Sequence, residues 1–198
     1  AFNIPNNSLS FEYFNNNIDL DNFFDYLIYN IYACNLDWAD NNMLVWKSEE
    51  LDNKWRWIVN DMDMTFKEPD IDNYYLLLSE KKTVTGAILK TILENTTLRD
   101  KFLNRFADLM NSVFLASNIH KKVDSIGAVL RPEINRQASL YPEACANWTE
   151  NIEKIKDFAT ARADNQRQHI LSYHDLSKTY NLNISSNINS YNSNTNNS

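Results

Sequence analysis

The sequence contains very little glycine and cysteine, and each scarcity excludes a class of function. Its only two glycines, Gly86 and Gly127, stand far apart in a chain of 198 residues. Phosphate-binding loops of the Walker and Rossmann kinds need clustered glycines, so neither kind is present. Two cysteines, Cys34 and Cys145, are too few for a disulfide framework, and no Cys/His cluster has zinc-ligand spacing. We expect both to be buried free thiols.

The sequence also lacks a surplus of basic residues and a long apolar run. Its net charge of −7 argues against a general nucleic-acid binder, so we expect no nucleic-acid partner. No apolar stretch reaches the ~18–20 residues that span a bilayer, so we expect no membrane-spanning segment. The first ten residues, AFNIPNNSLS, lack the basic start and apolar core of a signal peptide. They also lack an initial Met, which indicates a processed or trimmed chain.

The first third of the chain predicts a helix followed by a β-hairpin. Hydrophobic residues make up 43% of the sequence, enough for a folded domain with a sizeable core. Residues 20–32 have apolar side chains at helical spacing, with Asp19 or Asp21 as the N-cap. Residues 43–47 and 54–60 are rich in β-branched and aromatic residues and are joined by a polar turn, which is typical of two paired strands.

The rest of the chain is helical in pattern from about residue 85 onward. Residues 98–113 place apolar side chains on one face, with Thr97 as the expected cap, and a helix over 118–130 ends before Pro132. We therefore predict an α+β fold that is mainly α-helical, with about five to seven helices and one small hairpin. The tail, 179–198, is rich in Asn and Ser and reads as a linker or disordered end.

Oxygen-bearing side chains flank the predicted hairpin. The segment CNLDWADNN, residues 34–42, leaves the first helix and carries Asp37 and Asn42, and Asp61 and Asp63 follow the second strand. Taken singly, each of these residues is more typical of a turn or a solvated strand end. Together they favour a site lined by oxygen atoms, which suits Mg²⁺ or Ca²⁺ better than zinc or copper.

Protein kinases use the same order of groups. A catalytic-loop Asp engages the substrate hydroxyl, an Asn five residues later holds a metal, and an Asp after a hairpin holds Mg²⁺ on the nucleotide phosphates. In this template Asp37 is the catalytic Asp, Asn42 is the first metal ligand, and Asp61 or Asp63 is the second.

Two motifs carry a resemblance to a known family. The pattern N-x-D-W-x-x-N-N, followed by K-W-x-W-I-x-x-D-x-D-x-x-F, resembles the core of the CotH (spore coat protein H) family, and the likeness extends over about residues 10–175. The resemblance implies an atypical protein-kinase-like fold, with the domain over 1–178 forming the C-terminal lobe. It also implies transfer of phosphate from ATP to Ser or Thr hydroxyls of a protein substrate, with Mg²⁺ or Mn²⁺ as cofactor.

The resemblance assigns roles to particular residues. Asp37 matches the catalytic Asp, Asn42 matches the metal-binding Asn, and Asp61 matches the Asp that holds the metal and nucleotide, with Asp63 as a further metal ligand. Trp38 is expected to pack the loop and Trp57 to pack the hairpin.

The sequence departs from a complete kinase at its start. No segment before residue 20 is suited to form an N-lobe sheet, and no lysine precedes Lys47 to pair with the nucleotide phosphates. We therefore expect the chain to be part of a larger protein. On its own it should bind ATP poorly, and Mn²⁺ or Ca²⁺ more readily than Mg²⁺.

The alternative is a non-catalytic structural or interaction protein of the spore coat or cell surface that retains the lobe. By resemblance, either function indicates a bacterial envelope, spore-coat or extracytoplasmic setting.

The second half of the chain carries basic residues that are typical of a solvated helix face, namely Lys154, Arg162 and Arg167. We expect His169 to be a surface or packing residue.

Overall fold

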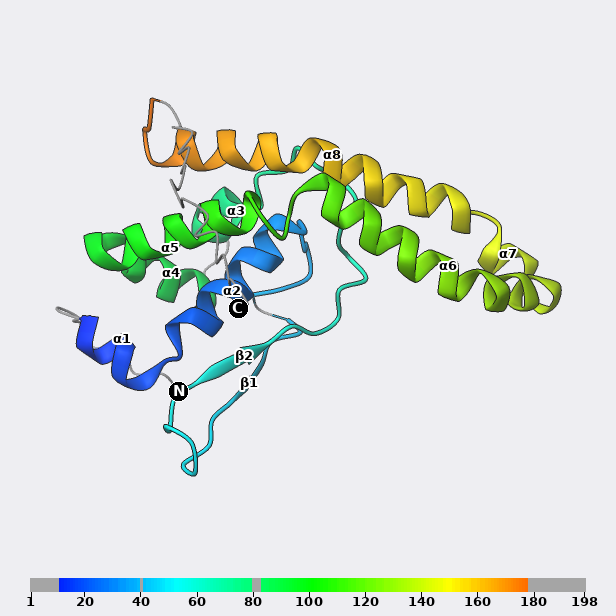
Figure 1. Ribbon diagram of the computed structural model, residues 1–198. Coiled ribbons are helices and arrows are strands. Elements are labelled where there is room, and N and C mark those ends of the chain that lie inside the picture. The colour runs from blue at the N-terminus through cyan, green and yellow to red at the C-terminus, as the bar shows by residue number, and fades with distance from the viewer. Residues whose placement is uncertain (1–10, 40, 80–82, 178–198) are drawn as a thin grey trace, which may run out of the picture.

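The computed structural model describes residues 11–39, 41–79 and 83–177. A helical body carries a two-stranded hairpin on one side and a long arm of two helices on the other (Figure 1). In chain order the elements are α1 (Phe11–Asn17), α2 (Leu20–Tyr32), β1 (Leu44–Trp46), β2 (Arg56–Ile58), α3 (Asn73–Ser79), α4 (Val84–Glu94), α5 (Thr96–Met110), α6 (Ala116–Leu140), α7 (Pro142–Cys145) and α8 (Trp148–Tyr173). This arrangement confirms the predicted class, mainly α with one small hairpin.

Helix α2 is the centre of the body. Asp19 caps its N-terminus, because its carboxylate accepts a hydrogen bond from the Asn22 backbone amide at 3.1 Å. The helix is buried on most of its surface and contacts β2, α3, α5 and α8. A helix that is apolar nearly all round belongs in a core and not at a surface. It therefore fixes the position of the loop that leaves its C-terminus.

The hairpin is docked on the first turn of α2. Strands β1 and β2 are antiparallel, with Leu44 opposite Ile58. The Asn22 side chain accepts a hydrogen bond from the Trp57 backbone amide at 2.7 Å and donates one to the Trp57 carbonyl at 3.2 Å. The Trp57 ring is buried, with its centroid 4.3 Å from that of Phe23. The predicted hairpin and the packing role of Trp57 are thus confirmed, although both strands are shorter than predicted.

Two predicted helix boundaries in the second half are wrong. The cap of α5 is Asn95 and not Thr97, because the Asn95 side chain accepts a hydrogen bond from the Leu98 amide at 3.1 Å. Helix α6 also continues through Pro132 instead of ending before it. Proline removes one intrahelical hydrogen bond, but this loss does not end α6 here. The described residues form eight helices, more than predicted, because α1, α3 and the short α7 had no clear signal.

The arm is formed by α6 and α8, which pack mainly against each other. It extends well away from the body, with α7 at its far end (Figure 1). In α6 only Gly127 is buried, and a Cβ at this position would lie 3.7 Å from the Trp148 ring. Within the described residues, no helix combines the length and apolar character needed to cross a membrane. The predicted tail, 179–198, lies outside the described residues.

Candidate functional site

Three buried asparagines anchor the loop that leaves α2. Asn35 donates from its side chain to the Asn30 side-chain oxygen at 2.9 Å, and its backbone amide donates to the Asn30 carbonyl. Asn73, at the start of α3, donates to the Asn35 carbonyl at 2.8 Å and to the Asn30 carbonyl at 3.3 Å. Buried amides satisfied in this way hold a backbone in one conformation. The loop therefore begins from a rigid base, which has no counterpart in the sequence prediction.

The structure brings Asp37 and Asn42 into contact. The Asn42 amide nitrogen donates to Asp37 Oδ2 at 3.0 Å and to the Asp37 carbonyl at 3.2 Å, and the Asn41 amide donates to Asp37 Oδ1 at 3.2 Å. Asn42 and Ala39 have φ values of 54° and 73°, a conformation that most residues adopt only when their surroundings enforce it. The loop is thus folded tightly around the Asp37 carboxylate.

Trp38 packs the same loop against α2. Its side chain is 2% exposed, and its ring lies edge-on to Tyr26 with the centroids 5.7 Å apart. The expectation that Trp38 packs the loop is confirmed. The adjacent Asp37 carboxylate, in contrast, is only half-buried, so the loop buries its aromatic residue and leaves its acid accessible.

The segment that carries Asp61 and Asp63 runs beside the start of the Asp37 loop. The Leu36 amide donates to the Met64 carbonyl at 3.4 Å, and the Phe66 amide donates to the Ala33 carbonyl at 2.9 Å. Both Asp61 and Asp63 are exposed, and no hydrogen bond or ion pair ties either side chain to another described residue. Both carboxylates are therefore available to an external ligand.

The hairpin sets Asn42 and Asp61 at the same end of the sheet. Leu44 lies opposite Ile58 in the last pair of the ladder, so the chain enters β1 from Asn42 and leaves β2 towards Asn60 at one end of the hairpin. Asp61 follows Asn60 directly, with a φ of 50°. Asp37 contacts Asn42 just before β1, and Asp61 follows just after β2, so all three belong to segments that leave the same end of the hairpin.

The oxygen atoms of Asn42, Asp61 and Asp63 supply only part of the coordination shell that a divalent cation needs. Among residues 11–39, 41–79 and 83–177, no three His, Cys, Asp or Glu side chains converge as a self-sufficient metal site. The amide oxygen of Asn42 and the carboxylates of Asp61 and Asp63 are all oxygen donors, as Mg²⁺, Mn²⁺ and Ca²⁺ prefer. A cation held here would complete its shell with water and phosphate oxygens, which is how Mg²⁺ is bound in most phosphoryl-transfer sites.

Arg162 is the main residue that the sequence prediction missed. Its guanidinium is fully buried and donates to the carbonyls of Tyr32, Ile31, Pro69 and Ile71 at 2.7–2.8 Å, and to the Gln166 side chain at 2.9 Å. Burial lowers the pKa of Arg162 from its ordinary value. The side chain joins the C-terminus of α2 to the segment that follows Asp63, so it fixes the two halves of the site relative to each other.

The prediction of a solvated face is therefore wrong for Arg162 and confirmed for Lys154, whereas Arg167 is partly buried and also donates to Asn111 at the C-cap of α5. Lys154 pairs with Glu150 and Arg167 with Asp164 on the surface of α8. The signal was present in the spacing, because Phe158, Arg162 and Ile170 fall on one helical stripe. A charged residue on an apolar stripe indicates burial with partners, and the prediction overlooked it.

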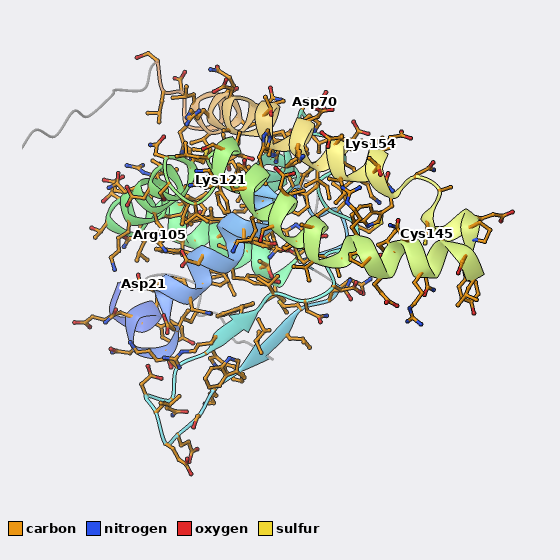
Figure 2. The ribbon with its side chains drawn as sticks, turned by 45° about the vertical axis from the view of Figure 1, so that its right-hand side comes forward. Asp21, Asp70, Arg105, Lys121, Cys145 and Lys154 are labelled. Carbon is orange, nitrogen blue, oxygen red and sulfur yellow. The ribbon has the colours of Figure 1, made fainter. Side chains whose placement is uncertain are left out.

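The predictions for the cysteines and for His169 are partly confirmed. Cys34 is buried, and this burial raises the pKa of its thiol, but Cys145 is half-exposed on the arm (Figure 2). His169 is a packing residue whose Nδ1 lies 3.8 Å from an Asp72 oxygen. Burial is the main cause that lowers the pKa of His169.

The chain belongs to the CotH kinase protein family, whose model matches residues 3–165. This match covers most of the chain and confirms the resemblance carried by the two sequence motifs. A comparison with curated proteins gives no match. The fold is thus that of a kinase-like family.

Proposed function

We propose that this protein is a metal-dependent phosphotransferase that transfers the γ-phosphate of ATP to a Ser or Thr hydroxyl of a protein substrate. The observation that carries the proposal is the contact between Asp37 and Asn42 at 3.0 Å, in a loop held beside the segment of Asp61 and Asp63. Family membership supports the same reading.

In this proposal each residue acts through its own oxygen atoms. The Asp37 carboxylate orients the substrate hydroxyl and accepts its proton as the hydroxyl oxygen bonds to the γ-phosphorus and ADP leaves. Asn42 and Asp61 would hold the divalent ion, Mg²⁺ or Mn²⁺, with Asp63 as a further ligand. When bound, the ion neutralises charge on the phosphate oxygens. The two side-chain amides that donate to Asp37 keep its carboxylate aimed before the substrate arrives.

Removing Asp37 or Asp61 tests the catalytic roles. In the full-length protein we expect Asp37→Ala and Asp61→Ala each to lower the rate of phosphate transfer by about 10²–10³-fold, the typical loss of one preorganised electrostatic group. The measurement is transfer of labelled phosphate from ATP to casein or to the protein itself, with Mn²⁺ present. Asp21→Ala is the matched control, because that carboxylate is 88% exposed and remote from the loop.

Near-normal transfer by both variants would refute the proposal, provided that circular dichroism shows each to be folded. No transfer by the wild-type protein, under conditions where it binds ATP and Mn²⁺, would favour the alternative of a non-catalytic structural or interaction protein. Either function fits the association of the family with the spore coat, and we place the protein in the bacterial envelope or an extracytoplasmic setting as part of the proposal.

The acidic segment should bind a divalent ion weakly in the absence of nucleotide. Because the residues supply only part of a shell, we expect Mn²⁺ or Ca²⁺ to bind with a Kd on the order of 10⁻⁴–10⁻³ M, and Mg²⁺ more weakly. Calorimetry or Mn²⁺ electron paramagnetic resonance measures this directly. Asp61→Asn should weaken binding more than Asp63→Asn, and Asp21→Asn should leave it unchanged. ATP added without metal should show little binding, and a tight metal-free complex would contradict the proposed site.

A further inference from the structure

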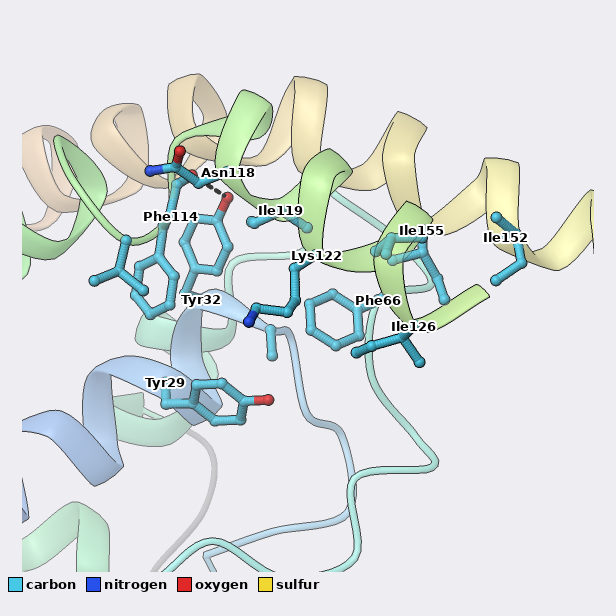
Figure 3. A pocket seen from close by; sticks show the side chains of 13 residues that line it. Tyr29, Tyr32, Phe66, Phe114, Asn118, Ile119, Lys122, Ile126, Ile152 and Ile155 are labelled. Carbon is cyan, nitrogen blue, oxygen red and sulfur yellow. Dashed lines mark hydrogen bonds between the residues drawn. The ribbon is translucent and has the colours of Figure 1, made fainter. Parts of the chain in front are cut away.

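A cavity lies away from the acidic residues, between the body and the arm. It has a volume of about 590 Å³ and is lined by the end of α2, the loop at Phe66, the start of α6 and the first turns of α8 (Figure 3). Small-molecule sites in proteins have volumes of about 300–1,000 Å³, so this cavity is of ligand size. None of the residues assigned to phosphate transfer lines it.

The wall of the cavity is almost entirely apolar. Aromatic rings of Tyr32, Phe66 and Phe114 form one side, and aliphatic side chains of α6 and α8, including Ile126 and Ile155, form the other. The Tyr32 hydroxyl is already satisfied, because it donates to the Phe114 carbonyl at 3.1 Å. Water inside such a wall finds few hydrogen-bond partners, so an apolar chain displaces it favourably.

Two polar groups stand at the edge of this apolar space. The Lys122 side chain crosses the opening from α6, and its ammonium group lies between the rings of Tyr29 and Phe66 (Figure 3). Among the described residues, no carboxylate lies within ion-pair distance of this ammonium group. Burial raises the pKa of Tyr29, so its hydroxyl remains a neutral hydrogen-bond donor. The edge of the cavity therefore offers one unpaired cation and one donor.

We propose that this cavity binds a single-chain amphiphile with an anionic head, namely a free aliphatic carboxylate of about ten carbons. The chain would lie along the isoleucines of α6 and α8, and the carboxylate would meet Lys122 and the Tyr29 hydroxyl. The argument for this occupant is charge complementarity. The ammonium group of Lys122 is the one cationic group in the cavity lining and has no carboxylate partner among the described residues, so an anionic head complements it.

Chain length and head-group charge test the proposal with purified wild-type protein. Calorimetry with octanoate and decanoate, both below their micelle concentrations and without divalent ions, should show one saturable site. Each buried methylene tightens binding by about fourfold, so decanoate should bind about 15-fold more tightly than octanoate. Decyltrimethylammonium, which has the same chain and the opposite charge, should bind at least tenfold more weakly than decanoate.

Matched variants on α6 separate the site from general adsorption. Lys122→Glu should weaken decanoate binding by at least tenfold, whereas Lys121→Glu, the same charge change at an exposed neighbour that does not line the cavity, should have little effect. Ile126→Asn should also weaken binding, whereas Val129→Asn, at a position 76% exposed on the same helix, should not. These positions are all exposed or partly exposed, so the variants are expected to fold.

Three results would overturn the proposal. The first is the absence of saturable binding by wild-type protein, and the second is equal weakening by Lys121→Glu and Lys122→Glu. The third is a concentration-dependent dimer in sedimentation that Ile126→Asn abolishes and decanoate does not affect, because the cavity would then be covered by a second copy of the chain. All three readouts are independent of phosphate transfer.

Discussion

Replacing Arg162 with methionine should lower the free energy of unfolding by about 3–5 kcal/mol. The fully buried guanidinium donates to four backbone carbonyls and one side-chain oxygen, and methionine would fill much of its volume without replacing these bonds. The Ile31, Ile71 and Pro69 carbonyls would keep other donors, whereas the Tyr32 carbonyl and the Gln166 side-chain oxygen would lose theirs. Each unsatisfied buried acceptor costs about 1–3 kcal/mol, partly relieved by water that enters. A loss of this size is a large fraction of the stability of an ordinary domain.

Arg167→Met in the same helix is the matched control. Arg167 makes an ion pair with Asp164 and donates to the Asn111 side chain at 3.1 Å, both near the surface, and we expect their loss to cost about 1–2 kcal/mol. Urea denaturation followed by circular dichroism measures both variants. Arg162→Lys should fall between wild type and Arg162→Met, because one ammonium cannot reach carbonyls on both segments at once. If Arg162→Met and Arg167→Met destabilise the protein equally, Arg162 does not hold the two segments together.

Replacing Trp38 with alanine should have an effect of similar size, about 3–5 kcal/mol, for a different reason. The indole is 2% exposed and packs on Tyr26 of α2, so its loss leaves a large cavity under the loop. Trp38 is also the residue after Asp37, and a collapse of the loop into that cavity would displace the Asp37 carboxylate. We therefore expect Trp38→Ala to lower phosphate transfer along with stability.

Trp46→Ala is the matched control for Trp38→Ala, because it removes an indole that is not buried. Trp46 lies on β1 and is 39% exposed, with the Arg56 guanidinium 5.4 Å from its ring centroid. Its removal should cost about 1 kcal/mol or less. Thermal unfolding by circular dichroism is the suitable measurement, since both variants alter tryptophan fluorescence directly. A Trp38→Ala protein as stable as Trp46→Ala would contradict the role of Trp38 under the loop.

The sequence predicted the parts of the site that depend on local pattern. Helix α2, its Asp19 cap and the hairpin follow from apolar spacing and β-propensity, and the Asp37–Asn42 spacing leads to a real contact. The parts that depend on distant residues were not predicted. Arg162 reaches carbonyls 91–131 residues away, and Asn73 reaches the loop from 38 residues away. A single sequence carries no record of such pairings, so only the buried stripe of α8 could have indicated them.

The arm of α6 and α8 should have a lower free energy of local unfolding than the helical body. Helices α6 and α8 contact chiefly each other, and α6 buries only Gly127, whereas α2 is covered on most of its surface. Amide hydrogen exchange follows the local free energy of opening, which is low where little apolar surface is buried. The outer part of the arm should therefore exchange its amide hydrogens through small openings that leave the body folded. Protection should rise along α8 towards Arg162, where the helix joins the core.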